Sequence, residues 1–112
     1  MPHVKQETTD QATTSSYATL LRARVLGFPR ATIVVTNSHG SYSLKYKVLT
    51  SNAPQGSANT WAEEKAEATL AAGAIERYVL SGPFAWIDVQ VVDATGGQHA
   101  TANCWLVATG IA

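Results

Sequence analysis

The chain has 112 residues, a length at which one domain with one core is expected. Its eight basic and eight acidic residues cancel, which excludes an overall field that would attract nucleic acid or an anionic membrane. Charged residues make up 14% of the sequence, well below the roughly 25% of typical soluble domains. This composition suits a subunit packed against others, with a solitary sandwich of low charge as the open alternative.

Residues 1–16 are rich in Thr, Ser and Gln, and Val4 is their only large aliphatic residue after Met1. Such a segment buries too little apolar surface to offset its ordering entropy, so we expect a flexible N-terminal arm. The arm is either a frayed terminus or a segment that becomes ordered on a neighbouring subunit. It lacks the pattern of a signal peptide, and no apolar run of the chain reaches the ~20 residues that span a bilayer. We therefore expect a protein made in a cytoplasm, with no membrane partner.

From Tyr17 onward, short runs in which apolar and polar residues alternate predict half-buried strands. The first predicted strand, residues 17–26, carries Arg22 and Arg24 on the face opposite its apolar residues. Two further strands are predicted at residues 31–37 and 42–50, joined by an Asn- and Gly-containing turn. The apolar faces of the first and third of these strands are formed by Leu21, Ala23, Val25, Tyr42, Leu44, Tyr46 and Val48.

Residues 51–59 are a predicted loop because of their Pro, Gly and Asn content, and residues 60–72 after them allow two interpretations. Strong helix formers and the charges of residues 63–67 favour a helix. The same residues also alternate, and the strands predicted on either side favour an edge strand whose charges discourage edge-to-edge pairing. We predict an edge strand, with a helix as the alternative.

Three more strands are predicted at residues 74–80, 85–93 and 99–109, separated by turns that contain glycine. In the first of them, Ile75 and Val79 lie on the face opposite Leu80. The second is expected to bury Ile87, Val89 and Val91. Seven runs with turn signals roughly every 8–12 residues predict an all-β fold, an antiparallel β-sandwich that is Ig-like or jelly-roll-like. The expected sandwich domain spans residues 17–112.

The sequence shows no constellation of catalytic residues. A nucleophile needs a base and an orienting acid beside it, whereas Cys104 lies on the apolar face of the last predicted strand, where a buried and inert thiol is expected. As the only cysteine, it cannot form an intrachain disulfide. The histidines His3, His39 and His99 lack metal-chelating spacing, and no glycine-rich phosphate loop opens a helix. We predict no enzyme, no metal and no cofactor.

The remaining charged residues are expected to be solvated. Glu76, Asp88, Asp93 and the acidic cluster at residues 63–67 are interpreted as residues of outer faces or turns. If their strands pair, a small basic stripe is formed by Arg22, Arg24, Lys45 and Lys47. Because the net charge is zero, this stripe is predicted to be a solvated or interfacial face and not a nucleic-acid site.

Tryptophan placement is the most informative feature for function. Trp86 and Trp105 alternate out of phase with the apolar residues of their strands, and Trp61 lies beside a loop. Exposed tryptophan is typical of interface hot spots. Three alternatives remain open: a curled sheet that buries the rings, a subunit interface, or a platform on which sugars stack. The candidate interface residues are Tyr17, Arg22, Arg24, Trp61, Trp86 and Trp105.

The succession ATIVVTNSHGSYSLKYKVLTS, TLAAGAIERYVLSGPFAWIDVQVVDA and a closing strand resembles small β-sandwich proteins of tailed-phage virions, over about Ala31 to Val107. The matched positions are turns and core residues, so the resemblance carries over no functional residue. Neither the arginines Arg22 and Arg24 nor the Glu-rich residues 63–67 belong to the shared pattern.

The resemblance implies a non-enzymatic viral structural protein located in the virion. The first expectation is a capsid decoration protein that binds the major capsid protein or other virion subunits, as a homo-oligomer for which a trimer is one arrangement. The alternatives are a neck or tail component and a carbohydrate-binding β-sandwich module.

Overall fold

A computed structural model of the chain describes residues 3–25, 28–52, 61–81 and 84–109. These residues form eight strands and no helix, so none of the described segments is a helix that could cross a membrane. The strands are β1 (His3–Ala12), β2 (Ala18–Arg24), β3 (Arg30–Asn37), β4 (Leu44–Ser51), β5 (Trp61–Leu70), β6 (Ile75–Ser81), β7 (Trp86–Asp93) and β8 (Thr101–Thr109).

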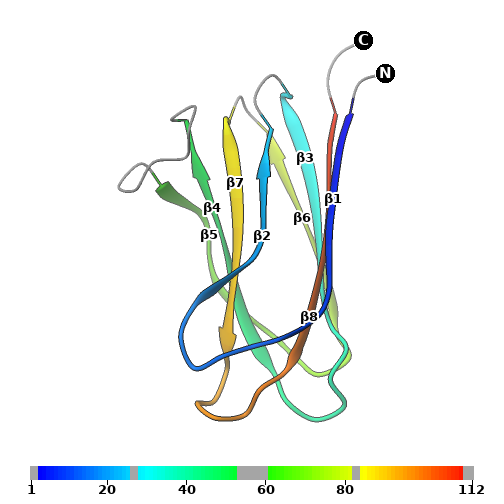
Figure 1. Cartoon of the computed structure of the whole chain (residues 1–112), viewed down its shortest axis with the longest axis vertical. Coiled ribbons are helices and arrows are strands. Elements are labelled where there is room, and N and C mark those ends of the chain that lie inside the picture. Colours follow the sequence, from blue (N-terminus) through cyan, green and yellow to red (C-terminus); the bar gives the residue numbers. More distant parts are fainter. Residues whose placement is uncertain (1–2, 26–27, 53–60, 82–83, 110–112) are drawn as a thin grey trace.

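The strands form two four-stranded antiparallel sheets that face each other (Figure 1). The β1 sheet has the order β1-β8-β3-β6 and the β2 sheet the order β2-β7-β4-β5. The pairs β4/β5, β3/β6, β2/β7 and β1/β8 are nested, as if one long hairpin were folded over into two layers. This eight-stranded arrangement is that of a jelly roll. The predicted antiparallel β-sandwich is confirmed, with eight strands instead of about seven and with jelly-roll instead of Ig-like order.

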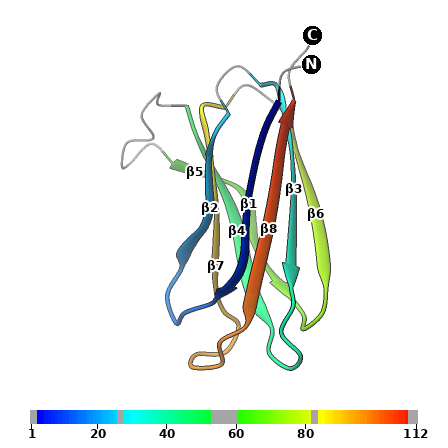
Figure 2. The same ribbon diagram turned by 45° about the vertical axis from the view of Figure 1, so that its right-hand side comes forward.

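The prediction of a flexible arm is wrong for residues 3–12, which form β1. This strand pairs with β8 from His3 opposite Thr109 to Ala12 opposite Thr101, and the two strands run side by side in Figure 2. The fold therefore begins before residue 17, where we placed the domain boundary. None of the side chains that the structure describes in β1, those of residues 5–12, is buried. The order of this strand comes from backbone hydrogen bonds to β8, which a search for buried apolar residues does not detect.

The strand interpretation of residues 60–72 is confirmed over Trp61–Leu70, which form the edge strand β5. Most of its side chains between Ala62 and Thr69 are exposed or half-buried, and its pairing with β4 has two register shifts. Charged side chains on such an irregular edge oppose pairing with another sheet. The strong helix propensity is overridden because β4 offers a partner.

The core lies between the two sheets and consists of the side chains that alternation directs inward. The predicted apolar positions Ile87, Val89 and Val91 of β7 are all buried, as are Leu44, Tyr46 and Val48 of β4. The β1 sheet contributes, among others, Ala31, Ile33, Val35, Cys104 and Leu106. Two outer faces remain, one on each sheet, and they carry the candidate interface residues.

Candidate functional site

Five of the six candidate interface residues belong to the outer face of the β2 sheet, here called the Trp61 face: Tyr17, Arg22, Arg24, Trp61 and Trp86. The pairing register explains this grouping. Arg24 pairs with Trp86, Trp86 with Ser51, and Ser51 with Trp61, so these residues form one row across all four strands. Side chains in one cross-strand row point to the same side of a sheet.

Arg22 has structural partners on the Trp61 face. Its guanidinium Nη2 lies 3.1 Å from Oδ2 of Asp88, and its Cζ lies 4.9 Å from the centroid of the Trp61 ring. Trp61 is consequently half-buried, and Trp86 is half-buried as well. The outward orientation predicted for Trp86 is correct, whereas its exposure is lower than expected.

Asp88 is only 1% exposed, so the prediction that it is a solvated residue is wrong. It points outward as alternation requires, but side chains from β2 and β7 cover it. Its Oδ2 accepts hydrogen bonds from Thr19 at 3.3 Å and from Gln90 at 3.0 Å, in addition to the ion pair with Arg22. Oδ1 is buried without a hydrogen-bond partner among the described residues.

At the other end of the Trp61 face, Tyr17 is also held by charged neighbours. Its hydroxyl donates a hydrogen bond to Glu67, and the Lys47 ammonium lies 4.1 Å from the centroid of its ring. Lys45 Nζ lies 3.4 Å from Glu67 Oε1. The hydrogen bond from Tyr17, followed by the charge of Lys45, lowers the pKa of Glu67.

The predicted basic stripe therefore does not exist as a continuous cationic surface. β7 separates β2 from β4, Arg22 is paired with Asp88, and Lys45 is paired with Glu67. Arg24 differs from these residues because it is exposed and forms no ion pair with any described residue. Its charge is therefore available to a binding partner.

Trp105 lies apart from the other candidates, on the outer face of the β1 sheet, here called the Trp105 face. It is 38% exposed, and its indole Nε1 donates a hydrogen bond of 3.0 Å to Oε2 of Glu7. Around it, Val107 is 39%, Val79 51% and Ile75 70% exposed. Four of the five large apolar side chains that are exposed in the described chain thus gather on this face.

Sequence reasoning missed Ile75 and Val79 because both faces of β6 carry apolar residues, so alternation alone does not reveal which face is inside. In the structure Leu80 is buried and Tyr78 packs against the core. The Tyr78 hydroxyl donates a hydrogen bond of 3.3 Å to the backbone carbonyl of Glu64 on β5. A tyrosine can satisfy its hydroxyl at the margin of a core, and this directs Ile75 and Val79 to solvent.

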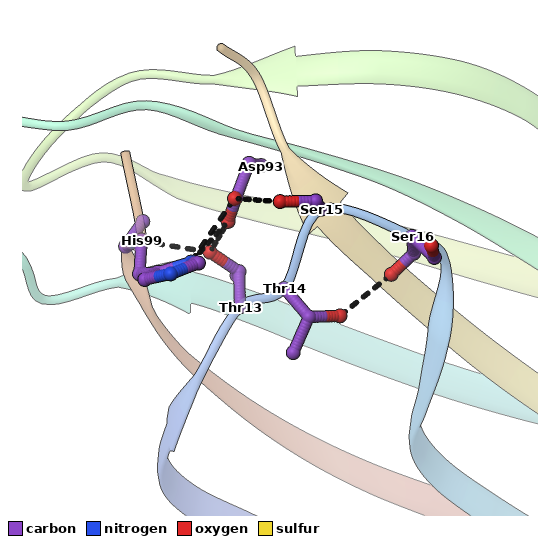
Figure 3. A network of polar contacts seen from close by, with 7 residues as sticks. Thr13, Thr14, Ser15, Ser16, Asp93 and His99 are labelled. Atoms are coloured by element: carbon purple, nitrogen blue, oxygen red, sulfur yellow. Dashed lines mark hydrogen bonds and ion pairs between the residues drawn. The ribbon is translucent and has the colours of Figure 1, made fainter. Parts of the chain in front are cut away.

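A polar network joins the β1–β2 connection to the β7–β8 turn (Figure 3). Asp93, whose side chain is 0% exposed, accepts a hydrogen bond from Thr13 Oγ1 at 2.5 Å and lies 3.0 Å from His99 Nδ1. The backbone N–H of Ala100 donates to Thr13 Oγ1 at 2.8 Å, and Ser15 Oγ lies 3.5 Å from Asp93. The expectation that Asp93 is solvated is wrong.

This network has a structural role and is not a catalytic triad. In a hydrolytic triad the nucleophile donates to the histidine, and the carboxylate orients that histidine from its other side. Here the Thr13 hydroxyl donates to the carboxylate itself, and Thr13 is only 2% exposed. Its position therefore prevents contact with a substrate, and the network connects two loops of the sandwich.

Burial by itself raises the pKa of Asp93, but the hydrogen bonds from Thr13 and His99 outweigh it and lower the pKa below its ordinary value of 3.8. A carboxyl group whose pKa is depressed by folding stabilises the fold above about pH 4, and this contribution is lost as pH falls through the folded-state pKa. We expect Asp93→Asn to be less stable than the unaltered protein by about 1 kcal/mol at pH 7, with a smaller difference near pH 3.

Chemical denaturation at several pH values measures this difference. Asp10→Asn is a suitable control, because Asp10 is an exposed acid at a positive φ that asparagine also tolerates. A stability difference between Asp93→Asn and the unaltered protein that is independent of pH would contradict the assignment.

Among the described residues, no three His, Cys, Asp or Glu side chains come together in a way that could hold a metal ion. Cys104 is 0% exposed, and its burial raises the pKa of the thiol to about 12. The predicted burial of this cysteine is confirmed, and a thiol that is protonated near neutral pH fits the expectation that it is inert.

The sequence matches no model of a protein family and no curated protein. Solved structures similar to the chain come from proteins of different kinds. A protein of Bacillus endospore appendages, which are disulfide-linked pili, has a TM-score of 0.62 and 11% identity over 98% of this chain and 89% of its own. The exported protein XepA of PBSX has a TM-score of 0.66 and 14% identity over 97% of this chain and 37% of its own.

A chain of infectious bursal disease virus Gx strain has a TM-score of 0.55 and 15% identity over 97% of this chain and 32% of its own. The present chain thus spans about a third of the viral chain and of XepA. A pilus protein, a viral protein and the exported protein XepA share this sandwich. A tenth of a tripeptidyl peptidase 2 chain also shares it, at a TM-score of 0.65 and 8% identity. Since all identities are low, these likenesses show the fold alone.

Proposed function

We propose that this chain is a non-enzymatic structural protein of a tailed-phage virion that decorates the capsid by binding the major capsid protein. The sequence pattern of residues 31–107 resembles virion proteins, and jelly rolls are a common architecture of viral shells. The viral chain among the structural neighbours supports the same class.

One observation carries the proposal: the Trp61 face gathers tryptophan, tyrosine and arginine from β2, β5, β7 and the residue before β2 on one outer surface. These are the residue types enriched in binding hot spots. Arg22 and Tyr17 are fixed by ion pairs and hydrogen bonds, so this surface loses little side-chain entropy when a partner covers it. Repeated copies on a shell act together, so that moderate affinity per copy is sufficient.

Arg24 provides the most direct test, because it is exposed and makes no ion pair within the described chain. We expect Arg24→Ala to lower the affinity for capsids that lack the protein by roughly tenfold, which is a moderate hot-spot effect. Co-sedimentation of the purified protein with such capsids, titrated to saturation, measures the affinity.

Arg30→Ala is the matched control, since Arg30 is an exposed arginine on the other sheet. Equal losses for the two variants, or no binding of the unaltered protein to capsids, would contradict the proposal. A glycan bound by the unaltered protein and lost in Trp105→Ala would favour a carbohydrate-binding module instead. One observation supports this alternative function: Trp105 lines an open groove beside Lys5 and Glu7.

A further inference from the structure

The Trp105 face is an apolar sheet surface that no described part of the chain covers. Its central strands β8 and β3 present Trp105, Val107 and the half-buried Val34, and the edge strand β6 adds Val79 and Ile75. Sheets of a sandwich normally bury one face and expose a polar one. The opposite outer surface, the Trp61 face, follows this rule with its ion pairs, whereas the Trp105 face does not.

The charged residues of this face are Lys5 and Glu7 on the β1 edge, Arg77 on the β6 edge and Arg30 at the start of β3. Glu7 on β1 pairs with Trp105, Trp105 with Val34, and Val34 with Arg77 on β6, so an anion and a cation terminate one cross-strand row. The indole hydrogen bond holds Glu7 over this row. Arg77 is exposed and forms no ion pair with any described residue.

We propose that a second copy of this chain covers the Trp105 face, related by a two-fold axis that runs parallel to the strands between β8 and β3. Such an axis places β1 of one copy over β6 of the other. Each cross-strand row then faces the same row of the other copy, in reversed order. Glu7 of each copy then faces Arg77 of the other, and this contact occurs twice. Apolar side chains meet in between, with Trp105 over Val34.

The geometry is that of an isologous contact, in which one patch is complementary to itself. Packed sheets lie about 10 Å apart with nearly aligned strands, a separation that the side chains of the two copies can fill. The other two-fold axis in the plane of the face runs across the strands. Centred between the rows of Trp105 and Val107, it would place Lys5 over Glu7 and Arg77 over Val79, whereas the axis along the strands places Lys5 over Val79. The axis along the strands is favoured because a guanidinium forms the stronger, bidentate pair with a carboxylate, while the flexible stem of Lys5 can keep its ammonium in water at the edge of the contact.

This pairing is independent of capsid attachment, because it is measured without capsids and uses the sheet opposite the Trp61 face. Sedimentation velocity of the full chain, over a range of concentrations at low ionic strength, tests it. The unaltered protein is expected to form a dimer. Glu7→Arg and Arg77→Glu each place two like-charged pairs in the contact and are expected to weaken the dimer roughly a hundredfold.

The doubly exchanged protein, Glu7→Arg with Arg77→Glu, restores opposite charges and is expected to recover most of the dimer affinity. Lys5→Glu is the matched control: it leaves the dimer nearly unchanged if the axis runs along the strands and disrupts it if the axis runs across them. Thermal unfolding of each variant verifies that the fold persists. A monomeric or trimeric unaltered protein, a double exchange that does not rescue, or a disruptive Lys5→Glu would overturn the proposal.

Discussion

Leu106→Ala is expected to lower the free energy of unfolding by about 3 kcal/mol, the largest effect of any substitution considered for this protein. Leu106 lies on β8 opposite Ile33 of β3, and both side chains are 0% exposed at the centre of the core. Truncation removes buried methyl groups and leaves a cavity that two closely packed sheets cannot fill by collapse. Urea unfolding measures the loss, which is a large fraction of the roughly 5–15 kcal/mol of a typical domain.

The neighbouring residue Val107 provides the control, because it points to the opposite side of the same strand and is 39% exposed. In a dilute sample, where the chain is monomeric, Val107→Ala is expected to cost well under about 1 kcal/mol. Similar losses for both variants would show that alternation along β8 does not separate the core from the outer face.

The contrast between Leu106 and Val107 also shows what the sequence could predict. Alternation fixes the inward side of a strand when only one of its faces is apolar, as in β4 and β7. Alternation did not identify the inward side of β6, because Ile75 and Val79 on one face are as apolar as Tyr78 and Leu80 on the other. The interaction that favours the Tyr78 side is the hydrogen bond from the Tyr78 hydroxyl to β5. Alternation also failed for β1, whose partner β8 lies at the other end of the chain and leaves no local signal.

The candidate interface was predicted in composition but not in arrangement. Trp61 and Trp86 do share a face, as an interaction surface requires, yet they do so because Ser51 pairs with both. Trp105 belongs to the other sheet, which no pattern within its own strand could reveal. The burial of Asp88 has the same origin, since an arginine from β2 covers an outward side chain of β7.

The two outer faces therefore suit different partners. The Trp61 face is polar and internally paired, whereas the Trp105 face exposes four large apolar side chains, with Glu7 and Arg77 at opposite ends of its central row. If two copies associate through the Trp105 face, both Trp61 faces point away from the contact. A dimer of this kind would offer two capsid-binding surfaces, and joint attachment strengthens binding only where the spacing of capsid sites allows it.

Arg22→Ala is the second substitution for which we expect a large loss of stability, about 2 kcal/mol. It leaves the buried carboxylate of Asp88 without its cation, while Thr19 and Gln90 still donate hydrogen bonds. Losing a partner of a buried charged group costs roughly 1.5–3 kcal/mol, and we take a value inside this range because the guanidinium side chain is 47% exposed and partly screened by water. Chemical denaturation measures the loss.

A double-mutant cycle separates the pair from its surroundings. We expect Arg22→Ala combined with Asp88→Asn to be less destabilising than the sum of the two single changes, by about 1 kcal/mol, because the neutral amide no longer needs the cation. Arg24→Ala, two residues along β2, is the control and should change stability by less than about 0.5 kcal/mol, because Arg24 makes no ion pair with the described residues. Additive losses would mean that Arg22 acts by covering Trp61, 4.9 Å away, and not through Asp88. The cycle also helps to interpret capsid binding. A binding defect of Arg22→Ala can arise from a lost contact or from a weakened fold, whereas a binding defect of Arg24→Ala is expected to arise from the lost contact alone.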